Sequence, residues 1–147
     1  YCLGAGLEVA ASCDLRVSSD DAVFGMPEVK VGIPSVIEAA LLPRLIGSGK
    51  ARQLVYTGES ISAAEAGRCG LVDRVVAAAD LNVATLEWVQ AISAAGPSAI
   101  RLQKRLARQW DAIPLHDAIR AGIQAFADAY ETDEPRRLMQ RFLDRPR

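Results

Sequence analysis

Apolar and polar positions divide the chain into two parts with different patterns. In the first, short apolar runs alternate with turn residues, which is typical of mixed α/β structure. In the second, apolar residues recur at three- and four-residue steps, which is typical of amphipathic helices. At 147 residues the chain has single-domain length. We therefore expect an α/β core over residues 1–78 and a helical region over residues 79–147.

The start of the first part predicts short strands and one short helix. Gly4-Ala5-Gly6 leads into a helix that carries Glu8, and a strand is expected over residues 14–17. The chain should break at Ser18-Ser19-Asp20-Asp21 and return through residues 22–25. Residues 29–34 are expected to form a loop because they contain glycine and proline.

Three helices and another strand should follow. Ser35 with Glu38, and Ser62 with Glu65, have the spacing of a capping box, so each serine is expected to open a helix. The first helix should end at Gly47, the second is expected over residues 50–56, and the third should close before Gly70. Residues 71–76 are rich in valine and predict a strand.

The second part predicts four helices. They are expected over residues 80–94, 98–110 and 114–130, with Thr132 capping the last one. Phe126 and Phe142 lie at helical spacing with other apolar residues, so core packing is their default interpretation.

Composition excludes several classes of partner. The formal net charge is −1, which gives no strong field for nucleic acid. We see neither an apolar run of membrane-spanning length nor a signal-peptide pattern. The three cysteines lack a CxxC spacing and favour free thiols in a reducing compartment. We therefore expect a cytoplasmic protein without nucleic acid or membrane partners.

Two glutamates and a glycine turn form the candidate site. Gly4 and Gly6 allow close approach of a ligand to the backbone. The first amides of the following helix lack intrahelical partners and can stabilise a developing negative charge. An isolated glutamate usually lies at the surface, but Glu8 has apolar neighbours and Glu28 follows Pro27. A pair that divides acid and base work is therefore favoured.

Other motifs carry less chemistry. Gly4-Ala5-Gly6 lacks the third glycine of a dinucleotide fingerprint, since Val9 stands in its place. Gly47-Ser48-Gly49-Lys50-Ala51 lacks the serine or threonine of a phosphate loop. With His116 as the sole histidine and scattered cysteines, no metal site is expected.

The motifs together resemble the enoyl-CoA hydratase/isomerase (crotonase) family in order and spacing. The matching segments are Gly4–Glu8, Cys13–Arg16, 22–28, 31–34, 42–47, 57–58, 61–66 and 70–76. The resemblance implies a crotonase-type α/β fold of ββα units, of which this chain lacks the N-terminal part. It also implies that the C-terminal helical region assembles homotrimers or dimers of trimers.

The resemblance further implies an activity and its residues. The activity is hydration of a 2-enoyl-CoA to a 3-hydroxyacyl-CoA in fatty acid metabolism, with CoA as part of the substrate and no cofactor. Glu8 would take a proton from water, Glu28 would protonate the α carbon, and the Ala5 N–H would bind the thioester oxygen. Gly4, Gly6 and Pro34 would border the substrate. Contacts with the CoA adenine and phosphates would come from Phe126, Phe142 and Arg145.

Three alternatives stay open. Where the family often has a glycine-rich run, this chain has Ser35-Val36-Ile37-Glu38. Glu38 is either a capping residue or a third carboxylate near the acyl chain. The second possibility would suit a double-bond isomerase that uses Glu28 or Glu38. The chain could also be an inactive truncated homologue that acts as an assembly partner, because the family's second oxyanion donor lies in the missing N-terminal part.

Overall fold

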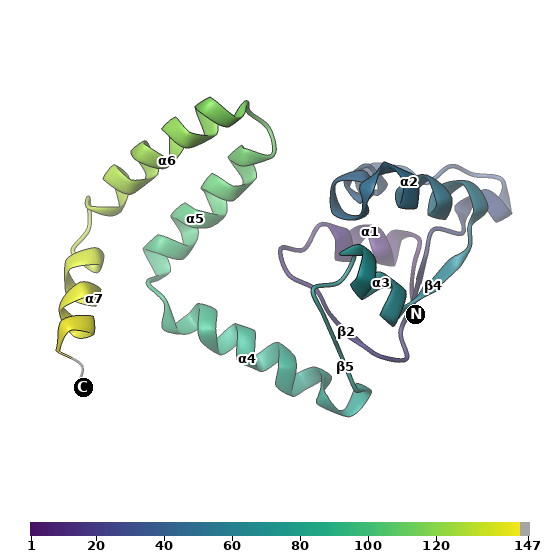
Figure 1. Cartoon of the computed structure of the whole chain (residues 1–147), viewed down its shortest axis with the longest axis horizontal. Coiled ribbons are helices and arrows are strands. Elements are labelled where there is room, and N and C mark those ends of the chain that lie inside the picture. Colours follow the sequence, from purple (N-terminus) through teal and green to yellow (C-terminus); the bar gives the residue numbers. More distant parts are fainter. Residues whose placement is uncertain (145–147) are drawn as a thin grey trace. The chain divides into compact units, whose positions relative to one another are not determined.

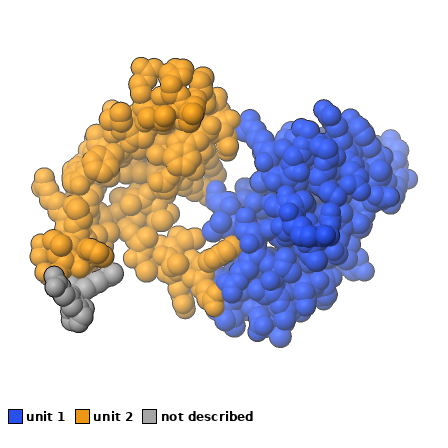
Figure 2. All heavy atoms as spheres, viewed as in Figure 1, with its two compact units in different colours: residues 1–86 blue, residues 87–147 orange. Residues whose placement is uncertain are grey.

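The computed structural model describes residues 1–144 and divides into two compact units (Figures 1 and 2). The first unit holds residues 1–86, and the second begins at Glu87. The elements of the first unit are β1 (Cys2–Leu3), α1 (Ala5–Ala11), β2 (Val17–Ser19), β3 (Val23–Gly25), the 3₁₀ helices η1 (Glu28–Val31) and η2 (Ile37–Leu41), α2 (Leu42–Thr57), β4 (Ser60–Ser62), α3 (Ala63–Cys69), β5 (Arg74–Val76) and η3 (Ala78–Asp80).

Two small sheets organise the first unit. In one, β3 lies between β1, which is parallel to it, and β4, which is antiparallel to it. In the other, β2 and β5 are parallel and pair Ser18 with Val75. A parallel pair needs a crossover connection, and here α2, β4 and α3 all lie between the two strands in sequence.

The core of the first unit lies where the helices meet the larger sheet. Its fully buried large side chains are Leu7, Met26, Leu42, Leu54 and Leu71. Each such side chain contributes about 1.5–3 kcal/mol of transfer free energy. Leu7 and Ala11 anchor α1 to this core by one face.

The first predicted strand is displaced. We expected a strand over residues 14–17 and a break at Ser18-Ser19, but β2 starts at Val17 and Ser18 is buried. The pairing of β2 with β5 sets where the strand begins, and Arg16 ties the preceding segment to the residues just before β5. Its guanidinium donates to the carbonyl oxygens of Leu71 and Cys13, both at 2.7 Å, and forms an ion pair with Asp73.

The two capping-box predictions have opposite outcomes. The Ser62 hydroxyl accepts a hydrogen bond from the Glu65 N–H at 3.3 Å, which confirms the cap of α3. The Ser35 prediction is wrong, because η2 begins at Ile37 and has no side-chain cap. The expected loop over residues 29–34 is also partly wrong, since η1 covers its first half.

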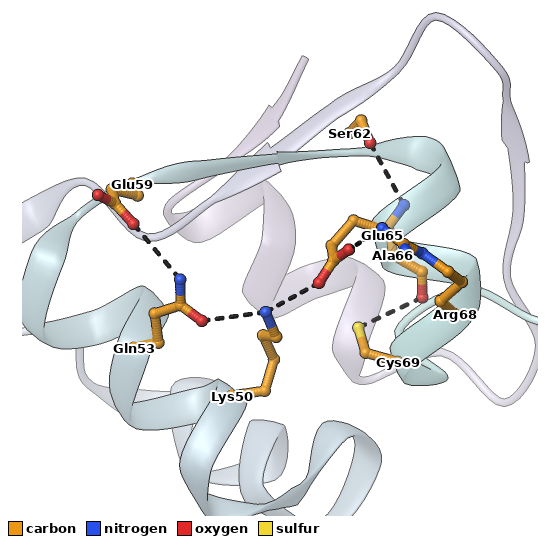
Figure 3. A network of polar contacts seen from close by, with 8 residues as sticks. All are labelled: Lys50, Gln53, Glu59, Ser62, Glu65, Ala66, Arg68 and Cys69. Carbon is orange, nitrogen blue, oxygen red and sulfur yellow. Dashed lines mark hydrogen bonds and ion pairs between the residues drawn. The ribbon is translucent and has the colours of Figure 1, made fainter.

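Helix α2 bends at the predicted break. Gly47 has φ 75° and ψ 153°, which separates two helical segments within Leu42–Thr57. The later segment is tied to α3 by Lys50, whose ammonium donates to Gln53 at 3.0 Å and to Glu65 at 2.9 Å (Figure 3). The hydrogen bond from Lys50, with the charges of Arg68 and Lys50, lowers the pKa of Glu65.

The second unit is helical. Its helices are α4 (Leu81–Ala94), which begins in the first unit, α5 (Pro97–Trp110), α6 (Leu115–Ala129) and α7 (Glu134–Leu143). These bounds lie close to the predicted ones. The Thr132 hydroxyl does accept a bond from the Glu134 N–H at 3.4 Å, although Asp133 is the N-cap of α7.

Within the described chain, core packing is the wrong interpretation for the apolar face of α6. Leu115, Ile119, Ile123 and Phe126 are 77%, 62%, 69% and 68% exposed. Phe142 on α7 is 65% exposed. Helix α6 packs against α5, and these apolar side chains stay largely exposed despite that contact.

Candidate functional site

A glycine turn leads from β1 into α1 and directs backbone amides outward. Gly4 has φ 53°, its N–H donates to the Gly25 oxygen at 2.9 Å, and its own oxygen accepts from the N–H groups of Leu7 and Glu8. Within residues 1–144, the N–H groups of Ala5 and Gly6 have no hydrogen-bond partner. Both residues are exposed, so these two amides are available to a ligand.

The Glu28 carboxylate lies directly over Gly4. A Cβ atom added to Gly4 would be 2.5 Å from Glu28 Oε1. The other oxygen, Oε2, accepts a hydrogen bond from the Ser35 hydroxyl at 2.9 Å. Gly4 is therefore required twice, for its positive φ and for the space that the carboxylate occupies.

Glu8 is a buried carboxylate in the first turn of α1, with 9% of the residue exposed. No group in the described part of the chain forms a hydrogen bond or ion pair with its side chain. Among the described residues, no fully buried side-chain oxygen lacks a partner, so the Glu8 oxygens keep some contact with solvent. A partly buried, unpaired carboxylate is unfavourable for folding, which marks Glu8 as a functional candidate.

The segment after η1 borders this group of residues. Helix η2 packs against α1, and Pro34 lies in the exposed loop between the two 3₁₀ helices. Glu38 is half-buried on η2, and its carboxylate has no partner among residues 1–144. Ile37 has φ 49°, which is an outlier for a β-branched residue.

The proposed CoA contacts belong to the second unit or lie outside the described residues. Phe126 on α6 is exposed and its ring lies 5.3 Å from that of Tyr130. Phe142 is exposed on α7. Arg145 is outside the described residues.

Ser35 is the site residue that sequence reasoning missed. Its spacing to Glu38 suggested a helix cap, whereas its hydroxyl donates to Glu28, seven residues earlier. A serine beside a proline gives no sequence signal for such a contact, because the contact depends on how the chain folds back after Gly32.

Residues 1–144 hold neither a candidate metal site nor a candidate membrane span. No cluster of three or more histidine, cysteine, aspartate or glutamate side chains could hold a metal ion there. No helix in the same range is long and apolar enough to cross a membrane.

Comparison with known proteins gives consistent relatives. The family model "Enoyl-CoA hydratase/isomerase" matches residues 1–147. The chain is 35% identical over 146 residues to the short-chain-enoyl-CoA hydratase of Clostridium acetobutylicum, covering 99% of this chain and 56% of that protein. It is 36% identical over 146 residues to the crotonyl-CoA hydratase of Syntrophomonas wolfei, again covering 99% and 56%. It therefore spans little more than half the length of these curated relatives.

The fold agrees with solved structures. The crystal structure of an enoyl-CoA hydratase from Bacillus anthracis matches with a TM-score of 0.93 at 34% identity, over 97% of this chain and 56% of that one. This confirms the predicted crotonase-type fold. By its sequence and its fold, the chain belongs to the enoyl-CoA hydratase/isomerase family.

Proposed function

We propose that the protein containing this chain adds water to a 2-enoyl-CoA and that Glu8 and Glu28 carry out the proton transfers. The observation that carries this proposal is the Glu28 carboxylate over Gly4, at the start of the helix that holds Glu8, which is buried and has no partner within residues 1–144. Family membership supplies the substrate class, because the relatives are named as hydratases of CoA thioesters.

The proposed reaction forms one C–O bond and one C–H bond. Glu8 takes a proton from water, whose oxygen attacks carbon 3 of the enoyl group. The electrons of the C2–C3 double bond then move onto the thioester oxygen, which gives an enolate. Glu28 protonates carbon 2 on the same face, and the thioester carbonyl re-forms. A proton passing from Glu8 to Glu28 through solvent restores the starting state.

The Ala5 amide supports the enolate step. Its N–H has no hydrogen-bond partner among residues 1–144 and, in the first turn of α1, can donate to the thioester oxygen as that oxygen becomes negative. Losing one such donor raises a barrier by about 3–4 kcal/mol. The family resemblance places a second donor in a segment that precedes this chain's motifs, so the activity is proposed for the natural protein that contains this chain.

Turnover of crotonyl-CoA tests the proposal through the loss of enoyl-thioester absorbance. We expect the natural protein to be active and Glu8→Gln and Glu28→Gln each to lower kcat about 10²- to 10⁴-fold, the usual range for a general acid or base. Glu131→Gln is the matched control, because Glu131 is an exposed glutamate between α6 and α7. Absence of turnover in the natural protein would favour the inactive assembly partner.

Double-bond isomerisation is the second candidate. It is favoured by Glu38, which is half-buried and unpaired within residues 1–144 and lies on the 3₁₀ helix that packs against α1. The same assay separates the two reactions when its products are identified. A hydratase gives the 3-hydroxyacyl-CoA, whereas an isomerase converts a 3-enoyl-CoA into the 2-enoyl-CoA without adding water.

We also propose that copies of this chain associate through the second unit. The support is the exposed apolar face of α6 formed by Leu115, Ile119, Ile123 and Phe126. Faces of this kind are typical of protein interfaces. A homotrimer or a dimer of trimers, as the family resemblance implies, would cover this face and would bring Phe126 and Phe142 near a neighbouring copy.

A further inference from the structure

We infer that Ser35 is a positioning residue that fixes which oxygen of Glu28 transfers the proton. The inference rests on the proposed hydration and deepens it, because it concerns the geometry of the proposed proton donor. It starts from one contact, the hydrogen bond of 2.9 Å from the Ser35 hydroxyl to Glu28 Oε2.

The chain is folded so that Ser35 returns to Glu28. Helix η1 ends at Gly32, whose φ of 80° reverses the chain direction. The Ile33 N–H then donates to the carbonyl oxygen of Glu28 at 3.2 Å. This backbone hydrogen bond holds Ile33, two residues before Ser35, against Glu28. The Ser35 hydroxyl therefore reaches the Glu28 carboxylate without a long, flexible connection.

The two oxygens of Glu28 therefore have different surroundings. Oε2 accepts a hydrogen bond from the Ser35 hydroxyl in a part-buried position. Oε1 is the oxygen that lies over Gly4, the residue that precedes the exposed Ala5 in the chain. An oxygen that accepts a hydrogen bond in this direction is the carbonyl-like oxygen of a protonated carboxyl group. The transferable proton is thereby assigned to Oε1, on the side of the proposed thioester site.

Ser35 has no competing local role in the structure. Helix η2 starts at Ile37 with Val36 as its N-cap, and no side chain caps it. The hydroxyl is thus not used for helix capping, although the sequence spacing suggested that use. Among residues 1–144, the hydroxyl has Glu28 as its only hydrogen-bond partner.

Substitution of Ser35 in the natural protein tests this inference. We expect Ser35→Ala to lower kcat for crotonyl-CoA about 10- to 100-fold with KM changed less than about threefold, because a misplaced catalytic group costs rate. Ser35→Thr keeps a hydroxyl and should retain kcat within about threefold. Val36→Ala is the matched control, because Val36 is the exposed neighbour in the same loop.

A second readout follows the delivery of the proton. The ratio of kcat in H₂O to kcat in D₂O, the solvent isotope effect, reports how far the proton transfer limits the rate. Ser35→Ala should show a larger solvent isotope effect than the natural protein, because transfer from a misplaced carboxyl group becomes slower relative to the other steps. A general loss of folding would lower the active fraction and leave this ratio unchanged.

The outcomes separate the two proposals. No turnover in the natural protein would overturn the proposed function and, with it, the role of Ser35 in hydration. Turnover in the natural protein with an unaffected Ser35→Ala variant would overturn the inference about Ser35 alone. A Ser35→Thr variant as poor as Ser35→Ala, with both showing the solvent isotope effect of the natural protein, would also overturn it.

Discussion

At Gly4 the backbone conformation and the neighbouring carboxylate both exclude a side chain. Gly4→Ala would place a methyl group 2.5 Å from Glu28 Oε1 at a φ of 53°. Positive φ alone costs a non-glycine residue about 1–2 kcal/mol. We expect the free energy of unfolding to fall by at least about 1–2 kcal/mol, as measured by urea denaturation, and kcat to fall because Glu28 is displaced.

Gly6→Ala is the matched control for this prediction. Gly6 lies in the first turn of α1, and a Cβ atom there would meet no atom within 4 Å. Alanine is favoured over glycine in a helix by about 0.5–1 kcal/mol. The free energy of unfolding should therefore rise slightly. If both variants lost the same stability, the close contact with Glu28 would not explain the effect at Gly4.

Ile37 carries backbone strain that a glycine would relieve. Its φ is 49° and its side chain is 72% exposed, so little burial would be lost on truncation. Relief of about 1–2 kcal/mol is offset by about 0.5–1 kcal/mol of glycine entropy. We predict that Ile37→Gly leaves the thermal midpoint unchanged or raises it.

The comparison for Ile37 is Val36→Gly. Val36 is 52% exposed and extended, with φ −130°. Because Val36 has no strain to relieve, glycine at this position adds only its entropic cost. Val36→Gly should therefore lower the thermal midpoint. A similar decrease in both variants would show that Ile37 stores no strain.

Sequence predicts local contacts better than distant ones, as two serines show. Ser62 and Ser35 both precede a glutamate by three residues. Ser62 caps α3 because its neighbours along the chain supply the whole contact. The Ser35 hydroxyl instead contacts Glu28 because the chain reverses direction after η1. The spacing of serine and glutamate in a capping box does not predict this reversal. Glu8 and Glu28 were predicted from their neighbours along the chain and from the family motif, whereas no motif pointed to the partner of Glu28.

Among the elements, α7 is linked to α5 by one carboxylate. Glu134 is buried, and it accepts hydrogen bonds from the N–H groups of Ala99 at 2.9 Å and Ser98 at 3.2 Å. These N–H groups belong to the first turn of α5, where amides lack intrahelical partners. The hydrogen bond from Ala99 lowers the pKa of Glu134 most, and the hydrogen bond from Ser98 also lowers it. Together they hold this pKa below its usual value of 4.5, although burial raises it.

This lowered pKa predicts an acid-sensitive link. A carboxyl group with a lowered pKa in the folded state stabilises the fold above its unfolded pKa, and the stabilisation is lost as the pH falls through the folded value. Glu134→Gln should therefore lower the unfolding midpoint clearly at pH 7. The difference from the unsubstituted protein should shrink as the pH falls below 4.5. Thermal unfolding between about pH 7 and pH 3 measures it.

Glu131→Gln is the control for Glu134→Gln, because Glu131 is exposed and lies three residues earlier. We expect no comparable change in midpoint from it. A difference between Glu134→Gln and the unsubstituted protein that stayed constant across this pH range would contradict the role of the charged carboxylate.

Element prediction succeeded where the pattern was long and failed where it was short. The helices over residues 81–143 were expected within a few residues because each repeats its apolar spacing over several turns. Strand β4 was missed, since only three residues form it and their pairing with β3 defines it. Strand β2 was displaced for the same reason, because its pairing with β5 sets its position.

At the scale of the molecule, the exposed apolar face of α6 predicts self-association. Ile119 and Ile123 lie near the middle of this face, at 62% and 69% exposed. Burying one such side chain contributes about 1.5–3 kcal/mol. Ile119→Glu combined with Ile123→Glu should therefore weaken association at least about 100-fold, which light scattering over a concentration series would measure.

Arg120→Gln is the control for the paired isoleucine change. Arg120 is exposed on the same helix and forms its ion pair with Asp117, also on α6. This substitution should leave the oligomer intact. A natural protein that is monomeric at all concentrations would contradict the proposed assembly.

The strand pairs of the first unit have a consequence for the integrity of the backbone. Residues 32–34 form an exposed loop, and segments that precede this loop in the sequence pair with segments that follow it. Strand β2 pairs with β5, and β3 pairs with β4. Arg16 likewise bonds to Leu71 and to Asp73. A protease that cleaved this loop would produce two polypeptides that remain bound to each other. The cleaved protein would therefore stay folded without a continuous backbone. Its two polypeptides would separate only in denaturant.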